Sequence, residues 1–207
     1  MSLITEAVQR LETQVCGSGC EDNIVTLKRN PDGPVCQYVR GVTVAGYYGG
    51  RIAHITTNFP IEANTRVSFM FGAALDTAPQ RMAALGIMNA VLGFLCLERT
   101  INACGATRYS DCQRDLTARI RGRSIYPVGT LSLPSGGGEV YAANPAAADI
   151  ILITGDGLCT DEGLALCEQY RDSGRLLFIG PETSGLCSLL DLPHWCPYGR
   201  ASPGEDA

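Results

Sequence analysis

Three apolar runs in the second half of the chain each end in a glycine turn, and these turns are the first candidates for chemistry. A glycine turn ahead of a helix exposes backbone N–H groups at the positive end of the helix dipole, which suits a phosphate or carboxylate. Ligands of open α/β sheets bind where the strands end. The turns therefore predict a small-ligand site. The expected ligand-binding positions in them are Gly129, Thr154, Gly155, Gly157, Gly180, Pro181 and Thr183.

Two acidic residues lie in the same turns and suit two kinds of chemistry. Asp156 and Glu182 could act as acid and base catalysts on a small metabolite, because burial beside another carboxylate raises a carboxyl pKa. Alternatively, their oxygens and the thiols of Cys159 or Cys187 could hold a transition metal or a metal chelate. These residues alone do not separate an enzyme from a binding protein.

The turn that begins at Gly155 also half-matches the dinucleotide-binding fingerprint. It lies between a predicted strand and a predicted helix, and Glu182 follows the next strand, where a ribose-binding acid belongs. However, Thr160 replaces the third glycine, and Asp156 would repel a pyrophosphate. A nucleotide-binding regulatory module is therefore an alternative hypothesis.

A predicted helix in the first half carries two further polar candidates. Asn89 falls on its apolar stripe between Leu85 and Leu92, and a buried amide must be hydrogen-bonded. Asn89 therefore either ties down a loop or faces a ligand cleft. Arg81, in the first turns of the helix, could reach an anionic ligand, although a solvated arginine is the commoner case.

The ten cysteines form no familiar metal motif. Cys16 and Cys20 would supply half a zinc site, but no second pair follows at ligand spacing. Reduced thiols, most of them buried as small apolar side chains, are expected instead. Neither His54 nor His194 has a nearby acid and nucleophile, so the sequence gives no argument for a catalytic triad.

Composition excludes several classes of function. The chain has 207 residues, a net charge of −5 and no Lys/Arg-rich run, which argues against nucleic acid as a partner. The N-terminus is amphipathic and acidic, unlike a signal peptide, and the longest apolar stretch is shorter than the roughly 20 residues that span a bilayer. We expect a soluble, cytoplasmic protein, without membrane contact, that forms a homodimer by covering an exposed sheet edge of its second half.

Hydrophobic periodicity predicts helices around an antiparallel meander in the first half. Predicted helices cover Leu3–Val15, the stretch from the Thr77–Gln80 capping box to about Leu97, and Ser110–Arg121. The meander is expected to have strands at Asn23–Arg29, Val35–Tyr47 and Arg51–Thr57.

The second half alternates apolar strands with helices, which indicates a parallel sheet. Predicted strands cover Ser124–Val128, Val140–Ala142, Asp149–Thr154 and Arg175–Ile179, and predicted helices cover Thr160–Asp172 and Ser184–Leu190. The link between Gly129 and Glu139 is too short for a crossover helix. It is either a bare loop, or the Val140 strand pairs as a hairpin or as a sheet edge.

These patterns together predict an α/β protein with a boundary at Gly122. An α+β domain is expected over 1–121, and a small, pared-down Rossmann-like domain with a parallel sheet over 122–200. Residues 201–207 are expected to form a disordered tail.

Several segments resemble one family. The stretches AADIILITGDGL and LLFIGPETSGL, preceded by SIYPVG, resemble the C-terminal domain of the heavy-metal chelation family of uncharacterised prokaryotic proteins. The helix QRMAALGIMNAVLGF and the preceding GVTVAGYYGGRIAHITT resemble that family's N-terminal helix and β-meander.

The resemblance implies an enolase-N-terminal-like domain followed by a Rossmann-like domain, with a ligand or metal-chelate site in the cleft between them. Asn89 and Arg81 would reach that cleft from the first domain, and the glycine turns would reach it from the second. Glu182 stands where the family usually has serine, and the link after Gly129 is shorter than the family's. These departures imply that the ligand differs from that of other members.

Overall fold

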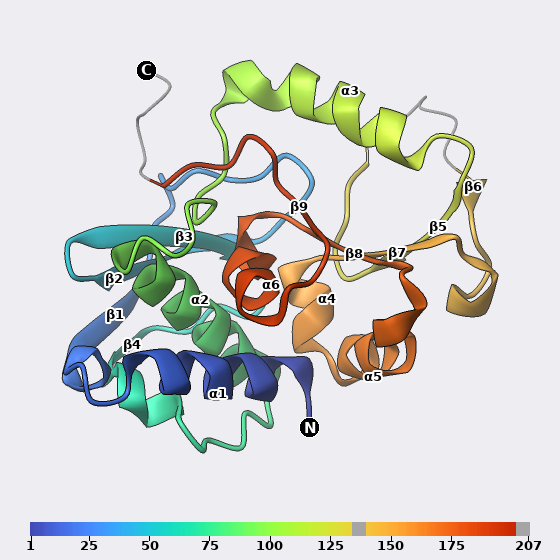
Figure 1. Cartoon of the computed structure of the whole chain (residues 1–207). Helices are drawn as coiled ribbons and strands as arrows, with labels where there is room; N and C mark the ends of the chain where they lie inside the picture. Colours follow the sequence, from blue (N-terminus) through green and yellow to red (C-terminus); the bar gives the residue numbers. More distant parts are fainter. Residues whose placement is uncertain (134–139, 202–207) are drawn as a thin grey trace.

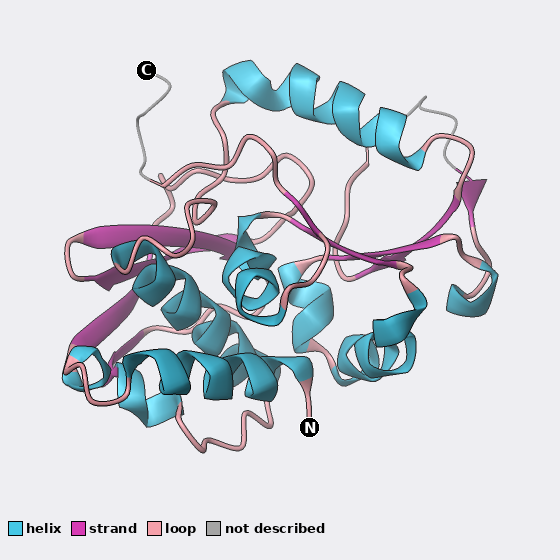
Figure 2. Cartoon of the chain, in the orientation of Figure 1, coloured by secondary structure: helices cyan, strands magenta, loops and turns pink. Residues whose placement is uncertain are grey.

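The computed structural model describes residues 1–133 and 140–201, and its strands form two sheets (Figure 1). The first is antiparallel with the order β3-β2-β1-β4, and the second is parallel with the order β6-β5-β7-β8-β9. Helices pack on both sheets (Figure 2). The predicted α/β class is confirmed. The predicted tail at 202–207 and residues 134–139 of the predicted link lie outside the described residues.

The elements have the following bounds. The strands are β1 Ile24–Arg29, β2 Val42–Tyr48, β3 Arg51–Thr57, β4 Ala63–Arg66, β5 Ser124–Val128, β6 Val140–Tyr141, β7 Ile150–Ile153, β8 Leu176–Ile179 and β9 His194–Trp195. The α-helices are α1 Leu3–Val15, α2 Ala78–Phe94, α3 Tyr109–Ile120, α4 Gly155–Cys159, α5 Asp161–Tyr170 and α6 Ser184–Leu190. The 3-10 helices are η1 Cys20–Asp22, η2 Val67–Met70, η3 Ala106–Arg108, η4 Pro145–Ala147, η5 Arg171–Ser173 and η6 Pro181–Thr183.

Local caps set the starts of the first two helices where the sequence predicts them. The Ser2 hydroxyl accepts a hydrogen bond from Thr5 N at 3.2 Å at the start of α1. Thr77 and Gln80 form the predicted capping box at the start of α2. Helix α2 ends at Phe94, slightly earlier than predicted.

The predicted strand over Val35–Tyr47 is wrong in its first half. Strand β2 begins only at Val42, because the preceding segment packs into a different core, between α3 and the parallel sheet. It does so through Cys36, Tyr38 and Val39. The predicted three-stranded meander also gains a strand that periodicity did not indicate, β4, which pairs with β1.

The Val140 strand resolves the question of the short link. Strand β6 pairs with β5 in parallel, with Ser124 opposite Val140 and Ile125 opposite Tyr141. It lies at the edge of its sheet, so the sheet-edge alternative is confirmed and the hairpin is not.

Helix α2 joins the two halves of the chain, because it packs on the antiparallel sheet and also on α4 and α6. One continuous apolar core therefore contains residues from both halves, among them Ile55, Met88 and Phe178. Helix α3 covers the other face of the parallel sheet with Leu116 and Ile120. None of the described helices is long and apolar enough to cross a bilayer.

Candidate functional site

The glycine turn after β7 is a short helix and not an open phosphate-binding loop. Thr154 caps α4, its Oγ1 accepting a hydrogen bond from Gly157 N at 3.2 Å. Thr160 then caps α5, its Oγ1 accepting from Gly163 N at 3.0 Å. The predicted helix after this turn is confirmed as α5, which begins at the Thr160 cap, but the turn itself forms a further short helix, α4, that the sequence did not predict.

The strand-end glycines lie close together, but they pack against the chain itself. A Cβ at Gly157 would overlap the carbonyl of Val128, and a Cβ at Gly129 would overlap the amide of Gly157. Gly129 and Gly180 also have φ values of 90° and 92°, which favour glycine. These glycines thus permit close packing of backbone on backbone at the carboxyl edge of the parallel sheet.

Both predicted catalytic carboxylates bind the end of β3. Asp156 is 7% exposed and accepts hydrogen bonds from Thr57 Oγ1 at 2.6 Å, Asn58 N at 3.0 Å and Asn58 Nδ2 at 2.6 Å. Glu182 is 1% exposed, and its Oε1 accepts from Thr56 N at 3.1 Å. The acids therefore connect the two sheets, and β3 covers the edge at which the sequence predicts a ligand.

Glu182 is the more perturbed of the two acids. Its Oε2 has no hydrogen-bond partner among the described residues. Burial raises the pKa of Glu182 from an ordinary value of 4.5 to about 7, and the charge of Asp156 adds to the rise. Such a pKa would suit an acid/base catalyst, but the carboxyl group is enclosed by protein.

Glu182→Gln is expected to change how stability depends on pH. A carboxyl whose pKa is raised on folding destabilises the folded state as pH rises from the unfolded pKa through the folded one. The wild type should therefore lose about 3 kcal/mol from this group between about pH 4.5 and pH 7, and the Gln variant should not. Urea unfolding at several pH values checks this, with exposed Glu168→Gln as the control. A difference between wild type and Glu182→Gln that stays constant with pH would contradict it.

Asn89 ties down a loop. Its Nδ2 donates to Pro181 O at 2.8 Å, and its Oδ1 accepts from Gly185 N at 2.9 Å. The side chain is fully buried. Of the two roles that the sequence left open, the structure thus supports the structural one, which fixes η6 and α6 on α2.

Arg81 also bonds to the protein itself. Its Nε donates to Leu75 O at 2.8 Å, one terminal nitrogen donates to Cys159 O at 2.8 Å, and the other donates to Asp76 O at 3.1 Å. Asp161 pairs with it at 2.7 Å. Arg81 therefore fastens α2 to the junction of α4 and α5.

The ten cysteines all lie within the described residues and form no disulfide, and most of them are buried. The buried ones are Cys36, Cys104, Cys112, Cys159, Cys167 and Cys187. Burial raises the pKa of the Cys167 thiol to about 12 and also raises the pKa values of Cys159 and Cys187, which disfavours the thiolates that bind metals. Among residues 1–133 and 140–201, no group of three or more His, Cys, Asp or Glu side chains is arranged to hold a metal ion.

Asn102 fastens the C-terminal segment beside β3. Its backbone pairs with that of Arg200 in both directions, at 3.0 and 3.1 Å. Its Oδ1 accepts from His54 Nδ1 at 2.7 Å, and Asn30 Nδ2 lies 2.9 Å from His54 Nε2. An imidazole that donates from Nδ1 and accepts at Nε2 is neutral, and burial accordingly lowers the pKa of His54. His54 therefore acts as a neutral hydrogen-bonding link between Asn102 and Asn30.

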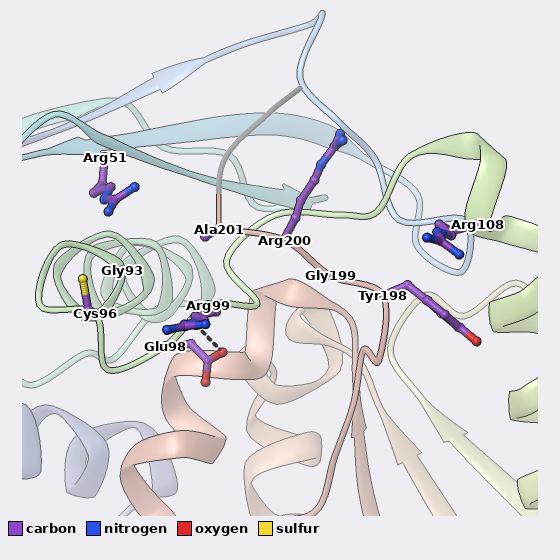
Figure 3. Close-up of a pocket in the computed structure, with 10 residues that line it drawn as sticks. All are labelled: Arg51, Gly93, Cys96, Glu98, Arg99, Arg108, Tyr198, Gly199, Arg200 and Ala201. Carbon is purple, nitrogen blue, oxygen red and sulfur yellow. Dashed lines mark hydrogen bonds between the residues drawn. The ribbon is translucent and has the colours of Figure 1, made fainter. Parts of the chain in front are cut away.

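A pocket opens where that segment passes the end of α2, with a volume of about 590 Å³ (Figure 3). Its charged lining residues are Arg51, Arg99, Arg108, Arg200 and Glu98. Four arginines against one glutamate make the pocket strongly positive, although the chain carries a net charge of −5. Arginine guanidinium groups are the side chains best suited to bind carboxylates and phosphates.

The charges of the pocket are only partly neutralised by the protein. Arg51 and Arg99 make no side-chain ion pair or hydrogen bond within the described part of the chain. Arg108 lies 3.9 Å from an oxygen of Asp111. The single acid, Glu98, already accepts hydrogen bonds through Oε1 from the N–H groups of Arg99 and Thr100, at 2.8 and 2.7 Å. The pocket therefore retains positive charge for a ligand.

Sequence analysis did not find this pocket, because its arginines come from distant segments. Arg51 begins β3, Arg99 follows α2, Arg108 ends η3 and Arg200 follows β9. No local run or spacing links them. The antiparallel bridge between Asn102 and Arg200 holds the last of these segments beside the stretch that follows α2. The predicted ligand positions at the strand ends do not line the pocket.

Comparison with known proteins supplies no relative. No family model matches the sequence, and neither a curated protein nor a solved structure matches the chain. The geometry of the arginine pocket is therefore the observation that bears on function.

Proposed function

We propose that this protein binds a small polyanion in the pocket of Arg51, Arg99, Arg108 and Arg200. The observation that carries the proposal is that four arginines from separate segments line one cavity, whose lining includes one acid, Glu98, that is already hydrogen-bonded. The volume of about 590 Å³ lies within the range of about 300–1,000 Å³ that is typical of small-molecule sites. It is larger than a single phosphate needs.

The spread of the arginines favours a ligand with more than one anionic group. Figure 3 shows Arg51 and Arg99 on the side of the pocket where Cys96 lies, Arg108 beside Tyr198 on the other side, and Arg200 between the two. One carboxylate or phosphate reaches only one or two guanidinium groups at a time. A compound with several carboxylates or phosphates would engage them all.

A metal chelate belongs to this class of ligand if its chelator carries free carboxylates. The chelator would then meet the arginines, and the protein would supply no metal ligand of its own. Kinship with the heavy-metal chelation family is part of the same proposal, as are enolase-N-terminal-like and Rossmann-like identities for the two halves. The sheet orders β3-β2-β1-β4 and β6-β5-β7-β8-β9 support those identities.

Calorimetric titration tests the proposal with citrate, pyrophosphate and ferric citrate as probes. At least one of them should bind, and its affinity should fall several-fold as salt approaches 1 M, where the Debye length is about 3 Å. Glycerol and spermidine serve as neutral and cationic controls. Tighter binding of ferric citrate than of citrate would favour the chelate. No binding of any anion, or equal binding of glycerol, would refute the proposal.

A further inference from the structure

The outer edge of β4 presents unpaired backbone. Strand β4 ends its sheet, and no described strand pairs with its outer side. Val67 N donates to Asn23 O at 3.2 Å, and the groups that face a neighbour alternate along an antiparallel strand. Ala63 and Thr65 therefore also direct their backbone toward β1, and the N–H and C=O groups of Asn64 and Arg66 point outward.

The two faces of β4 differ in character. Glu62, Asn64 and Arg66 are exposed. Ile61, Ala63 and Thr65 line an apolar groove of about 290 Å³ on the other face. That groove also includes Phe69, which is 80% exposed. The unpaired backbone of a sheet edge can pair with a further strand. A partner at this edge would also bury the exposed aromatic side chain.

The charged residues along the outer edge of β4 are complementary to the same residues of a second copy of the chain. If β4 pairs antiparallel with β4 of a second copy, backbone hydrogen bonds form only in registers that place outward-pointing residues of the two strands opposite each other. Centring the pair on Asn64 places Glu62 directly opposite Arg66 of the partner subunit, and symmetry repeats this contact. Within its own chain Glu62 accepts a hydrogen bond from Arg29 N at 3.2 Å, and Arg66 lies 3.8 Å from Asp22 Oδ1. Both side chains are exposed, so ion pairs across the axis add to these contacts or replace them. Opposite charges at such positions stabilise a strand pair.

We propose that β4 is a dimer interface, in which two copies join their antiparallel sheets edge to edge through Ala63–Arg66. Each strand then satisfies the outward groups of the other, and Glu62 and Arg66 form two symmetric ion pairs across the axis. The groove-lining faces of both copies, with both Phe69 side chains nearby, form one apolar surface. This inference is independent of the arginine pocket.

Charge reversal followed by charge exchange tests the interface. Sedimentation velocity over a concentration series should show a dimer for the wild type. Arg66→Glu and Glu62→Arg should each raise the dimer dissociation constant at least about tenfold, since each places like charges opposite one another twice. The double variant Glu62→Arg/Arg66→Glu should dimerise more tightly than either single variant, because the exchanged charges are again complementary across the axis. Arg29 and Asp22 then face like charges within each copy, so the recovery is expected to be partial.

Arg121→Glu, an exposed reversal of the same charge beyond α3, is the control and should leave the dimer unchanged. Circular dichroism confirms that each variant folds. A monomeric wild type would overturn the proposal. So would a dimer that the single reversals do not weaken, or a double variant that fails to recover.

Discussion

The double variant Arg51→Met/Arg99→Met is expected to lose at least about 100-fold in affinity for citrate or pyrophosphate. Each guanidinium would contribute charge-assisted hydrogen bonds of about 1.5–3 kcal/mol to a bound anion, and about 2.7 kcal/mol is 100-fold. Methionine keeps much of the apolar stem and removes the charge and the hydrogen-bond donors of the guanidinium. Calorimetric titration of wild type and variant measures the loss.

This variant separates binding from folding. Arg51 and Arg99 make no side-chain ion pair or hydrogen bond within the described residues, so the free energy of unfolding should change by no more than about 0.5 kcal/mol per substitution. Arg121→Met/Arg123→Met removes the same charge from exposed positions after α3 and should bind like the wild type. An equal loss in this control would mean that the affinity comes from net charge and not from the pocket.

Asn89→Ala is expected to destabilise the fold by about 3 kcal/mol. It leaves Gly185 N without its partner, which costs about 1–3 kcal/mol for a polar group in the interior. It also removes one of the two donors to Pro181 O, which keeps the hydrogen bond from Ser184 Oγ. A Cβ on Gly185 would come within 2.5 Å of Asn89 Oδ1, so α6 packs closely on this side chain. Urea unfolding measures the change in the free energy of unfolding.

The matched control for this prediction is Asn144→Ala. Asn144 is exposed, and its Oδ1 accepts a hydrogen bond from Ala147 N at the start of η4. Loss of such a cap costs about 1 kcal/mol. If Asn89→Ala costs no more than Asn144→Ala, Asn89 does not have the structural role that its hydrogen bonds indicate.

Elements set by local chemistry could be predicted from the sequence. Helix α1 has its apolar stripe and its Ser2 cap within its own residues, and strand β3 lies at Arg51–Thr57 as predicted. Elements whose position depends on tertiary packing could not be predicted from the sequence. The segment before Val42 has strand-like residues, but it packs against α3 and the parallel sheet and so leaves the antiparallel sheet.

The candidate site also depends on tertiary contacts that the sequence does not reveal. Sequence analysis identified Glu182 and Asn89 as unusual polar residues, and both are buried at the junction of the two halves. Glu182 faces the protein because it binds Thr56, and Asn89 does so because it binds Gly185. Each partner is far away in sequence from the residue that it binds. No local sequence pattern indicates the arginine pocket, because its arginines come from separate segments.

Citrate titration followed by NMR of the arginine side-chain Nε–H signals tests the central claim most directly. The proposal predicts saturable shifts at Arg51, Arg99, Arg108 and Arg200, while the signal of Arg171, whose guanidinium is paired with Glu6, stays in place. Shifts spread evenly over exposed arginines, or no shift at the four pocket arginines at saturating citrate, would contradict it.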